Sequence, residues 1–146
     1  MTDPEFIVAI PARFGASRLP GKPLRLIGGE PMVVHVARRA LAAGASQVVV
    51  ATDDPRIAEA VRDQPLTVCM TRADHPSGTD RLAECAVALA WRDEQIVVNL
   101  QGDLPTLAPE DIRAVVAPFA DPAVDIATLA AEIRDPHEHA NPNVVK

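Results

Sequence analysis

A short apolar run leads directly into a basic loop in the sequence Phe6-Ile7-Val8-Ala9-Ile10-Pro11-Ala12-Arg13-Phe14-Gly15-Ala16-Ser17-Arg18-Leu19-Pro20-Gly21-Lys22. Residues 6–10 are continuously apolar and end at a proline, which is typical of a strand buried on both faces at the centre of a parallel sheet. The basic loop therefore leaves the carboxyl end of a strand. Because open α/β sheets bind their ligands at that edge, the sequence predicts a ligand site in this loop.

The charge of this loop differs from that of the whole chain. Four basic residues and no acid lie between Pro11 and Arg25, although the chain carries a formal net charge of −6. Arginine and lysine suit phosphate oxygens, and the two glycines of the loop let backbone N–H groups approach an anion. Leu19-Pro20 interrupts the phosphate-loop pattern of nucleotide hydrolases, and no dinucleotide glycine pattern occurs. We expect a nucleoside triphosphate here, a solvated turn being the alternative.

The bulk composition limits the other possibilities. The chain has 146 residues and 48% hydrophobic content, which suits one domain with a real core. Residues 41–146 hold 17 acids against 8 bases, which argues against a nucleic-acid partner. We expect a cytoplasmic protein with no membrane partner, since no apolar stretch approaches about 20 residues and the N-terminus lacks a basic signal. Cys69 and Cys85 are expected to be buried free thiols.

The rest of the chain alternates short apolar runs with helical patterns. Further strands are expected at 47–52, 66–70, 95–100 and 125–130, with the start of another at 141–146. Helices are expected at 31–41, 55 to about 62, 79 to about 90, and 109 to about 117. Strands joined by long crossovers pair in parallel, so the sequence predicts a doubly wound, mostly parallel α/β sheet with helices on both faces.

Two further polar loops follow expected strands, at 71–80 and 101–105, and parallel topology brings both to the edge that holds the basic loop. Asp103 comes just after a very apolar strand, where a carboxylate is costly to bury without a cation. Mg²⁺ commonly takes one or two protein carboxylates and completes its shell with phosphates and water. Asp103 is therefore the candidate Mg²⁺ ligand, with a turn or helix cap as the alternative. His75 is the one histidine expected near the site.

Taken together, the three loops resemble the 3-deoxy-manno-octulosonate (Kdo) cytidylyltransferases, the CMP-Kdo synthetases of lipopolysaccharide synthesis. The matching motifs are Ile10-Pro11-Ala12-Arg13-Phe14 with Ser17-Arg18-Leu19-Pro20-Gly21-Lys22-Pro23-Leu24, Cys69-Met70-Thr71-Arg72-Ala73-Asp74-His75 with Ser77-Gly78-Thr79-Asp80-Arg81, and Asn99-Leu100-Gln101-Gly102-Asp103-Leu104-Pro105. The likeness runs from Phe6 to Lys146 in uninterrupted order. It implies a Rossmann-like nucleotidyltransferase fold and the transfer of CMP from CTP to Kdo, with release of pyrophosphate and with Mg²⁺ as cofactor.

The resemblance also implies roles for single residues. Arg13, Arg18 and Lys22 would hold the triphosphate. Arg13, Lys22 and Asp103 would form the catalytic set, with Asp103 on the metal.

The base and the sugar have their own implied partners. Four residues would surround the cytosine, largely through backbone groups: Thr71, Arg72, Ala73 and Ser77. Gln101 would touch the sugar.

The chain departs from the family pattern in two ways. Leu104 stands where family members usually carry a glutamate, which removes a charge next to Asp103. Family chains are also considerably longer. We therefore expect residues 1–146 to be the nucleotide-binding part of a single domain whose C-terminal part is absent. That part would supply a second metal-binding aspartate, most sugar contacts and much of a homodimer interface. The alternatives are a module that binds CTP without catalysis, or an enzyme for a related acidic sugar such as an 8-amino Kdo analogue or a sialic acid.

Overall fold

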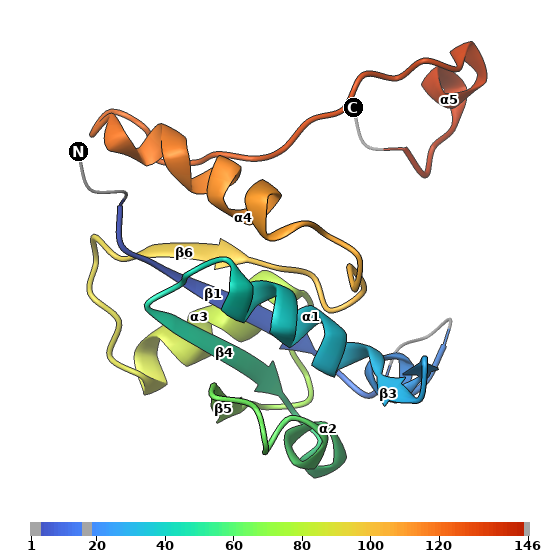
Figure 1. Cartoon of the computed structure of the whole chain (residues 1–146), viewed down its shortest axis with the longest axis vertical. Helices are drawn as coiled ribbons and strands as arrows, with labels where there is room; N and C mark the ends of the chain where they lie inside the picture. Colours follow the sequence, from blue (N-terminus) through green and yellow to red (C-terminus); the bar gives the residue numbers. More distant parts are fainter. Residues whose placement is uncertain (1–3, 16–18, 145–146) are drawn as a thin grey trace.

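A computed structural model describes residues 4–15 and 19–144 and shows a central parallel sheet (Figure 1). The sheet has the spatial order β5-β4-β1-β6. Its strands are β1 (Phe6–Ala12), β4 (Gln47–Thr52), β5 (Thr67–Met70) and β6 (Ile96–Asn99). A separate short hairpin pairs β2 (Leu26–Ile27) with β3 (Glu30–Pro31). All three pairings within the central sheet are parallel, as predicted.

The helices connect these strands. The α-helices are α1 (Met32–Ala42), α2 (Pro55–Ala60), α3 (Gly78–Ala88), α4 (Pro109–Val116) and α5 (Pro136–Ala140). Two short 3₁₀ turns are η1 (Lys22–Leu24) and η2 (Ala117–Ala120). Among the helices of the described residues, none is both long enough and apolar enough to cross a membrane.

Strand β1 is the centre of the fold because it pairs with β4 on one side and β6 on the other. Its register places Ala12 opposite Thr52 of β4 and Ala9 opposite Asn99 of β6. Residues 6–10 are all buried, which explains why this run carries no polar side chain. The basic loop and the loop after β6 therefore leave neighbouring strands at the same edge of the sheet.

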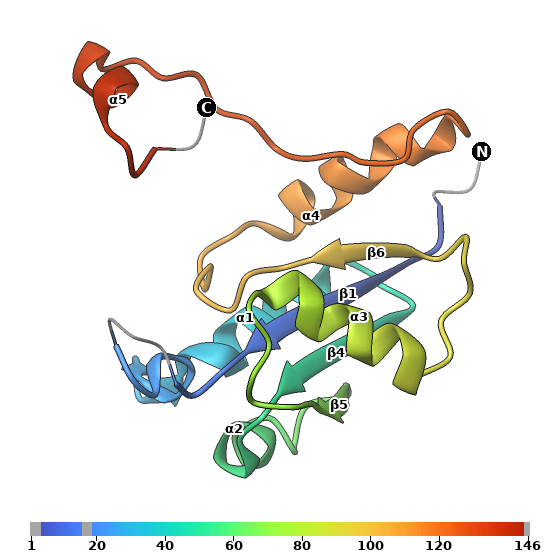
Figure 2. The same ribbon diagram turned by 180° about the vertical axis from the view of Figure 1, so that it is seen from behind.

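Alternating side chains of the strands pack against helices on both faces of the sheet. Val8 and Ile10 belong to one apolar core together with buried residues of α1, α2 and α4. Ile7 and Ala9 belong to a second core with Leu82 and Cys85 of α3. Figures 1 and 2 show these two layers from opposite sides. Each fully buried valine or isoleucine contributes roughly 1.5–3 kcal/mol relative to an exposed one, so the layers hold the strand ends in place.

Local signals set where the helices begin. The Asp54 carboxylate accepts a hydrogen bond from the Arg56 N–H and caps α2. The Ser77 hydroxyl accepts one from the Asp80 N–H and caps α3. The caps explain why these polar residues precede helices, and α3 is thereby fixed at the edge that carries the loops.

Two expected strands are not formed. Residues 125–130 are extended but belong to no strand, and Ile126 in this segment is 87% exposed. A cavity of about 550 Å³ lies between this segment, β6 and α4, so the backbone of 125–130 has no neighbouring ladder to pair with. Residues 141–144 form a turn rather than the start of a strand, and 145–146 lie outside the described residues. Both strand predictions were therefore wrong, since neither segment pairs with a neighbouring strand among the described residues.

The helix ends also differ slightly from the prediction. Helix α2 ends at Ala60 instead of Arg62, because the chain turns at Val61 and the Gln64 N–H donates to the Val61 carbonyl oxygen. The cysteines behave as expected: Cys69 and Cys85 are both free and buried.

Candidate functional site

The first and third loops meet through an ion pair. The Nζ atom of Lys22 lies 2.8 Å from Oδ2 of Asp103, and the two side chains are 38% and 49% exposed. Lys22 begins η1 at the end of the basic loop, whereas Asp103 follows β6. The structure thus confirms that these two loops converge, and it places a cation and a carboxylate side by side at the carboxyl edge of the sheet.

The basic loop is closed by a contact between Phe14 and Gly21. The Gly21 N–H donates to the Phe14 carbonyl oxygen at 2.8 Å. Gly21 has a φ of +69°, and a Cβ added there would lie 3.0 Å from the Phe14 ring, so this position requires glycine. The Arg56 guanidinium lies 3.6 Å from the centre of the same ring and also pairs with Asp54. Lys22 is therefore presented from a closed loop anchored to α2.

Close backbone approach brings the third loop up to β1. A Cβ added at Gly102 would lie 3.2 Å from the carbonyl oxygen of Pro11. Gly102 thus lets the turn before Asp103 pass directly beside the end of the central strand. Leu104, which follows, is 41% exposed and adds no charge to the site.

The second loop joins the other two around a small cavity. This cavity of about 170 Å³ is lined by residues of all three loops and of α3: Pro11, Arg13, His75, Pro76, Ser77, Gly78, Arg81 and Gln101. A Cβ added at Gly78 would lie 3.0 Å from the Pro11 side chain, which shows how closely the start of α3 packs against β1. Arg13, Ser77 and Gln101 are thereby brought together, as the sequence predicted, while Arg18 lies outside the described residues.

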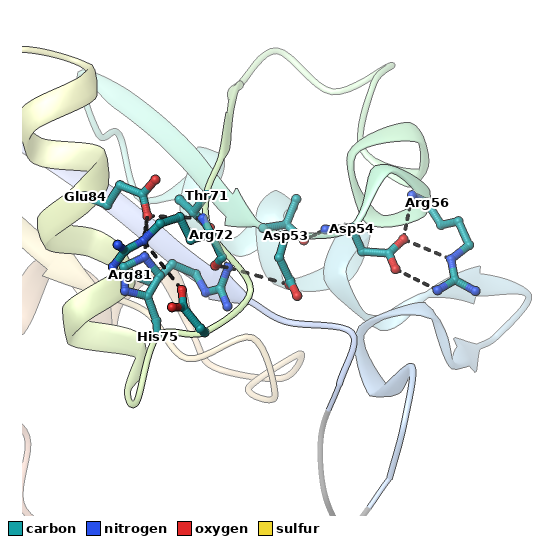
Figure 3. Close-up of polar contacts among 10 residues, drawn as sticks. Asp53, Asp54, Arg56, Thr71, Arg72, His75, Arg81 and Glu84 are labelled. Carbon is teal, nitrogen blue, oxygen red and sulfur yellow. Dashed lines mark hydrogen bonds and ion pairs between the residues drawn. The ribbon is translucent and has the colours of Figure 1, made fainter.

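Several polar groups of the second loop are already hydrogen-bonded within the protein (Figure 3). The Thr71 N–H donates to the Thr52 carbonyl oxygen, and the Thr71 hydroxyl oxygen accepts from Arg81. The Arg72 N–H donates to Glu84, and the Arg72 carbonyl oxygen accepts from Arg81. Of the consecutive residues Thr71, Arg72 and Ala73, Ala73 is the one whose own backbone N–H and carbonyl oxygen make no hydrogen bond within the described part of the chain.

The electrostatics of this loop depend on Glu84 and His75. His75 is buried, and its Nε2 contacts the Glu84 carboxylate. This hydrogen bond lowers the pKa of Glu84 below its ordinary value, and the N–H of Arg72 adds to the effect. His75 therefore borders the site, as expected, and also ties the loop to α3.

A sequence model of the Cytidylyltransferase family matches residues 7–146, which is nearly the whole chain. The chain belongs to the cytidylyltransferase family. The matched region contains the three loops described above and all the candidate site residues.

Named relatives narrow the likeness further. A 3-deoxy-manno-octulosonate cytidylyltransferase of Rhodopseudomonas palustris (strain HaA2) is 63% identical over 147 residues, covering 100% of this chain and 60% of the relative. One of Stenotrophomonas maltophilia (strain R551-3) is 58% identical over 143 residues, covering 97% of this chain and 56% of the relative. This cytidylyltransferase-family chain thus spans about 60% of the length of the curated relatives it matches.

A solved structure shows the same fold. The structure of CMP:2-keto-3-deoxy-manno-octonic acid synthetase complexed with CTP superimposes with a TM-score of 0.75 and 47% sequence identity. The match covers 83% of this chain and 50% of that one. The parallel sheet described above is accordingly part of a nucleotidyltransferase fold.

Asp103 is the carboxylate at this edge that could hold a metal ion. Within residues 4–15 and 19–144, no cluster of three or more histidine, cysteine or acidic side chains could hold a metal ion. Asp103 stands alone but is half-exposed and lies next to the expected phosphate position at Lys22. Such a single carboxylate fits Mg²⁺, which retains waters and takes phosphate oxygens in place of further protein ligands.

The sequence did not predict that Arg81 and Glu84 of α3 hold the second loop through hydrogen bonds. Arg81 and Glu84 lie three positions apart on α3, so they share one face of the helix. Arg81 is only 2% exposed, an unusual environment for a charged side chain. The helical spacing was visible in the sequence, but the burial was not.

Proposed function

We propose that this protein transfers CMP from CTP to 3-deoxy-manno-octulosonate, giving CMP-Kdo and pyrophosphate as a step in lipopolysaccharide synthesis. The observation that carries the proposal is the meeting of Lys22 and Asp103 beside the cavity that holds Arg13 and Gln101. This pairing offers cations for a triphosphate and an oxygen ligand for its metal. The relatives named above and the CTP-bound neighbour support the choice of nucleotide and sugar.

The residues of the first loop would bind and polarise the triphosphate. The anomeric hydroxyl of the sugar would lose its proton to solvent and attack the α-phosphorus, so that a new P–O bond forms as the bond to the pyrophosphate oxygen breaks. Arg13 and Lys22, with Arg18, would stabilise the negative charge that grows on the departing pyrophosphate. No protein nucleophile is needed, since holding the two substrates in line supplies much of the rate enhancement.

Asp103 would hold Mg²⁺ in this proposal. The ion supplies charge neutralisation for the triphosphate when it is bound. Lys22 forms an ion pair with this carboxylate. Binding of the metal and the nucleotide would free Lys22 to turn to the phosphates. The exchange conserves local neutrality, because each charge of the pair finds an opposite partner in the ligand.

The cytosine would lie in the cavity between the second and third loops. With the backbone N–H and carbonyl oxygen of Arg72 and the Thr71 hydroxyl engaged by α3, the backbone N–H and carbonyl oxygen of Ala73 would be left to bind the base. Gln101 donates to Asn99 through its Nε2, which leaves its carbonyl oxygen to face a ligand. Ser77 lines the cavity while its hydroxyl caps α3.

The proposal extends to location and assembly of the whole protein. Two buried free thiols suit a reducing compartment, so we propose the cytoplasm. A homodimer is proposed for the full-length protein, following the family pattern.

The direct test is pyrophosphate release from CTP, Mg²⁺ and Kdo, with CTP binding measured in parallel by calorimetry. We expect binding and release, and a panel containing 8-amino Kdo and a sialic acid should show preference for Kdo. Binding without release would reduce the function to that of a nucleotide-binding module. Absence of CTP binding would overturn the proposal. Glu110→Ala is the matched control, since Glu110 forms an exposed pair with Arg113 on α4, away from the site.

A further inference from the structure

Helix α3 holds the second loop through a charged side chain that is almost completely buried. Arg81 is 2% exposed, and its Nη1 donates to the Thr71 hydroxyl oxygen and, at 3.1 Å, to the carbonyl oxygen of Arg72. Asp53, at the end of β4, lies 3.6 Å from the same nitrogen and compensates the charge. Burying a guanidinium is costly unless it is paired and hydrogen-bonded, so each of these contacts constrains the others.

One turn further along α3, Glu84 holds the peptide group on the other side of Arg72. Its Oε2 accepts a hydrogen bond from the Arg72 N–H at 3.2 Å and contacts Nε2 of the buried His75. Both backbone hydrogen-bonding groups of Arg72 are therefore taken up by α3, as Figure 3 shows from the side of the loop. The peptide group before Arg72 is therefore held through its N–H and the peptide group after it through its carbonyl oxygen, which restricts rotation of the backbone on both sides of Arg72.

Arg72, held on both sides, comes immediately before Ala73 in the loop that borders the proposed base cavity. The start of that loop is tied to β4 by the hydrogen bond from the Thr71 N–H to the Thr52 carbonyl oxygen. Its end is tied to α3 by the Ser77 cap. Between these two anchors, the backbone of residue 72 and the side chain of His75 are held by contacts with Arg81 and Glu84 of α3.

We propose that Arg81 and Glu84 are positioning residues that fix the two peptide groups flanking Arg72 and thereby set the base-facing loop before a nucleotide binds. The role of this loop in binding the base rests on the function proposed above. The restraint of the backbone at Arg72 can be measured without ligand. Neither side chain needs to touch the nucleotide, since both act through the backbone of Arg72. A preset loop lowers the ordering cost of binding.

The first measurement is amide exchange at single residues in the ligand-free protein, followed by NMR. We expect the Arg72 amide of the unmodified chain to be protected and Glu84→Ala to speed its exchange by about tenfold or more, the effect of losing a hydrogen bond to a charged group. Amides of β1 and β4 should keep their rates, which separates a local change from general unfolding. An Arg72 amide whose exchange is unchanged in Glu84→Ala would overturn the proposal.

The second measurement is CTP affinity. Glu84→Ala should weaken CTP binding about tenfold and narrow the preference for CTP over UTP, whereas Glu84→Gln, which keeps an acceptor oxygen, should recover much of both. The control Glu110→Ala should stay within about twofold of the unmodified chain. Arg81→Lys tests the second proposed positioning residue. If that variant does not fold, the Glu84 variants still test the proposal. Failure of the unmodified chain to bind CTP would overturn the proposed function. Amide exchange would still show whether Glu84 restrains the backbone at Arg72. Normal CTP affinity and base preference in Glu84→Ala would overturn the proposal that the preset loop contributes to base binding.

Discussion

The side chains of Lys22 and Asp103 form an ion pair of 2.8 Å across 81 residues of sequence. Both side chains are more than one-third exposed, and exposed pairs of this kind contribute only about 0–1 kcal/mol to stability. The pair therefore opens at little cost. In the proposed function, Lys22 would turn to the triphosphate and Asp103 would be left to hold Mg²⁺.

Replacing Asp103 tests the role of this pair. In Asp103→Asn, we expect the free energy of unfolding to change by less than about 1 kcal/mol, and pyrophosphate release to fall about a hundredfold or more. Without metal, the variant should bind CTP at least as tightly as the unmodified chain, because Lys22 no longer has a competing carboxylate. Urea unfolding, pyrophosphate release and calorimetry in a chelator check the three parts. An unchanged rate of release would refute the metal-binding role of Asp103.

Gly21→Ala should destabilise the protein by roughly 2 kcal/mol, because an alanine there meets both a left-handed backbone and the Phe14 ring. Urea unfolding measures this cost. Two alanine variants serve as controls: Gly28 has a φ of +58° with open space around it, and Gly15 has open space without that strain. The expected order of destabilisation is Gly21, then Gly28, then Gly15. Equal losses for Gly21 and Gly28 would show that the contact with Phe14 adds nothing.

The cysteines should be unreactive in the folded protein. Burial raises the pKa of the Cys85 thiol strongly, and the neighbouring Cys69 adds to the shift, so almost no thiolate forms at pH 8. A colorimetric thiol reagent should modify neither cysteine in the native chain and both in urea. Rapid modification of Cys85 under native conditions would mean that the core between α3 and the sheet opens frequently.

Acid should weaken the attachment of the second loop to α3. The pKa of Glu84 is lowered in the folded protein, chiefly by the hydrogen bond from His75, so its charged form stabilises the fold at pH values above its ordinary pKa of 4.5. That contribution is lost as the pH falls below this value. Urea unfolding between pH 6 and about pH 3 should therefore show a steeper loss of stability in the unmodified chain than in Glu84→Gln. Parallel curves would indicate that Glu84 makes no such contribution.

The sequence allowed correct prediction of the elements whose signals are local. The buried run at 6–10, the helices that begin near residues 55 and 79, and the convergence of Lys22 with Asp103 all follow from apolar continuity, helix-start signals and parallel topology. Each of these depends on residues that are adjacent in the chain or on a general property of parallel sheets.

The errors arose where the outcome depends on a partner. Residues 125–130 have the composition of a strand, but a strand needs a neighbour for its hydrogen bonds, and β6 is separated from this segment by a cavity. The burial of Arg81 could not be predicted either, because it depends on the simultaneous positions of Thr71, Arg72 and Asp53. Such networks become visible only when the strands and helices are in place.

The pairing of β6 with β1 also has a consequence for folding. Contacts between residues far apart in sequence form slowly, because a long loop must close before they contribute any stability. A chain emerging from the ribosome has Lys22 long before Asp103, so the phosphate side of the site exists first without its carboxylate. Docking of β6 then brings Asp103 to Lys22. A nucleotide bound across the two loops would stabilise the docked position of β6, because it binds only the state in which both loops are in place.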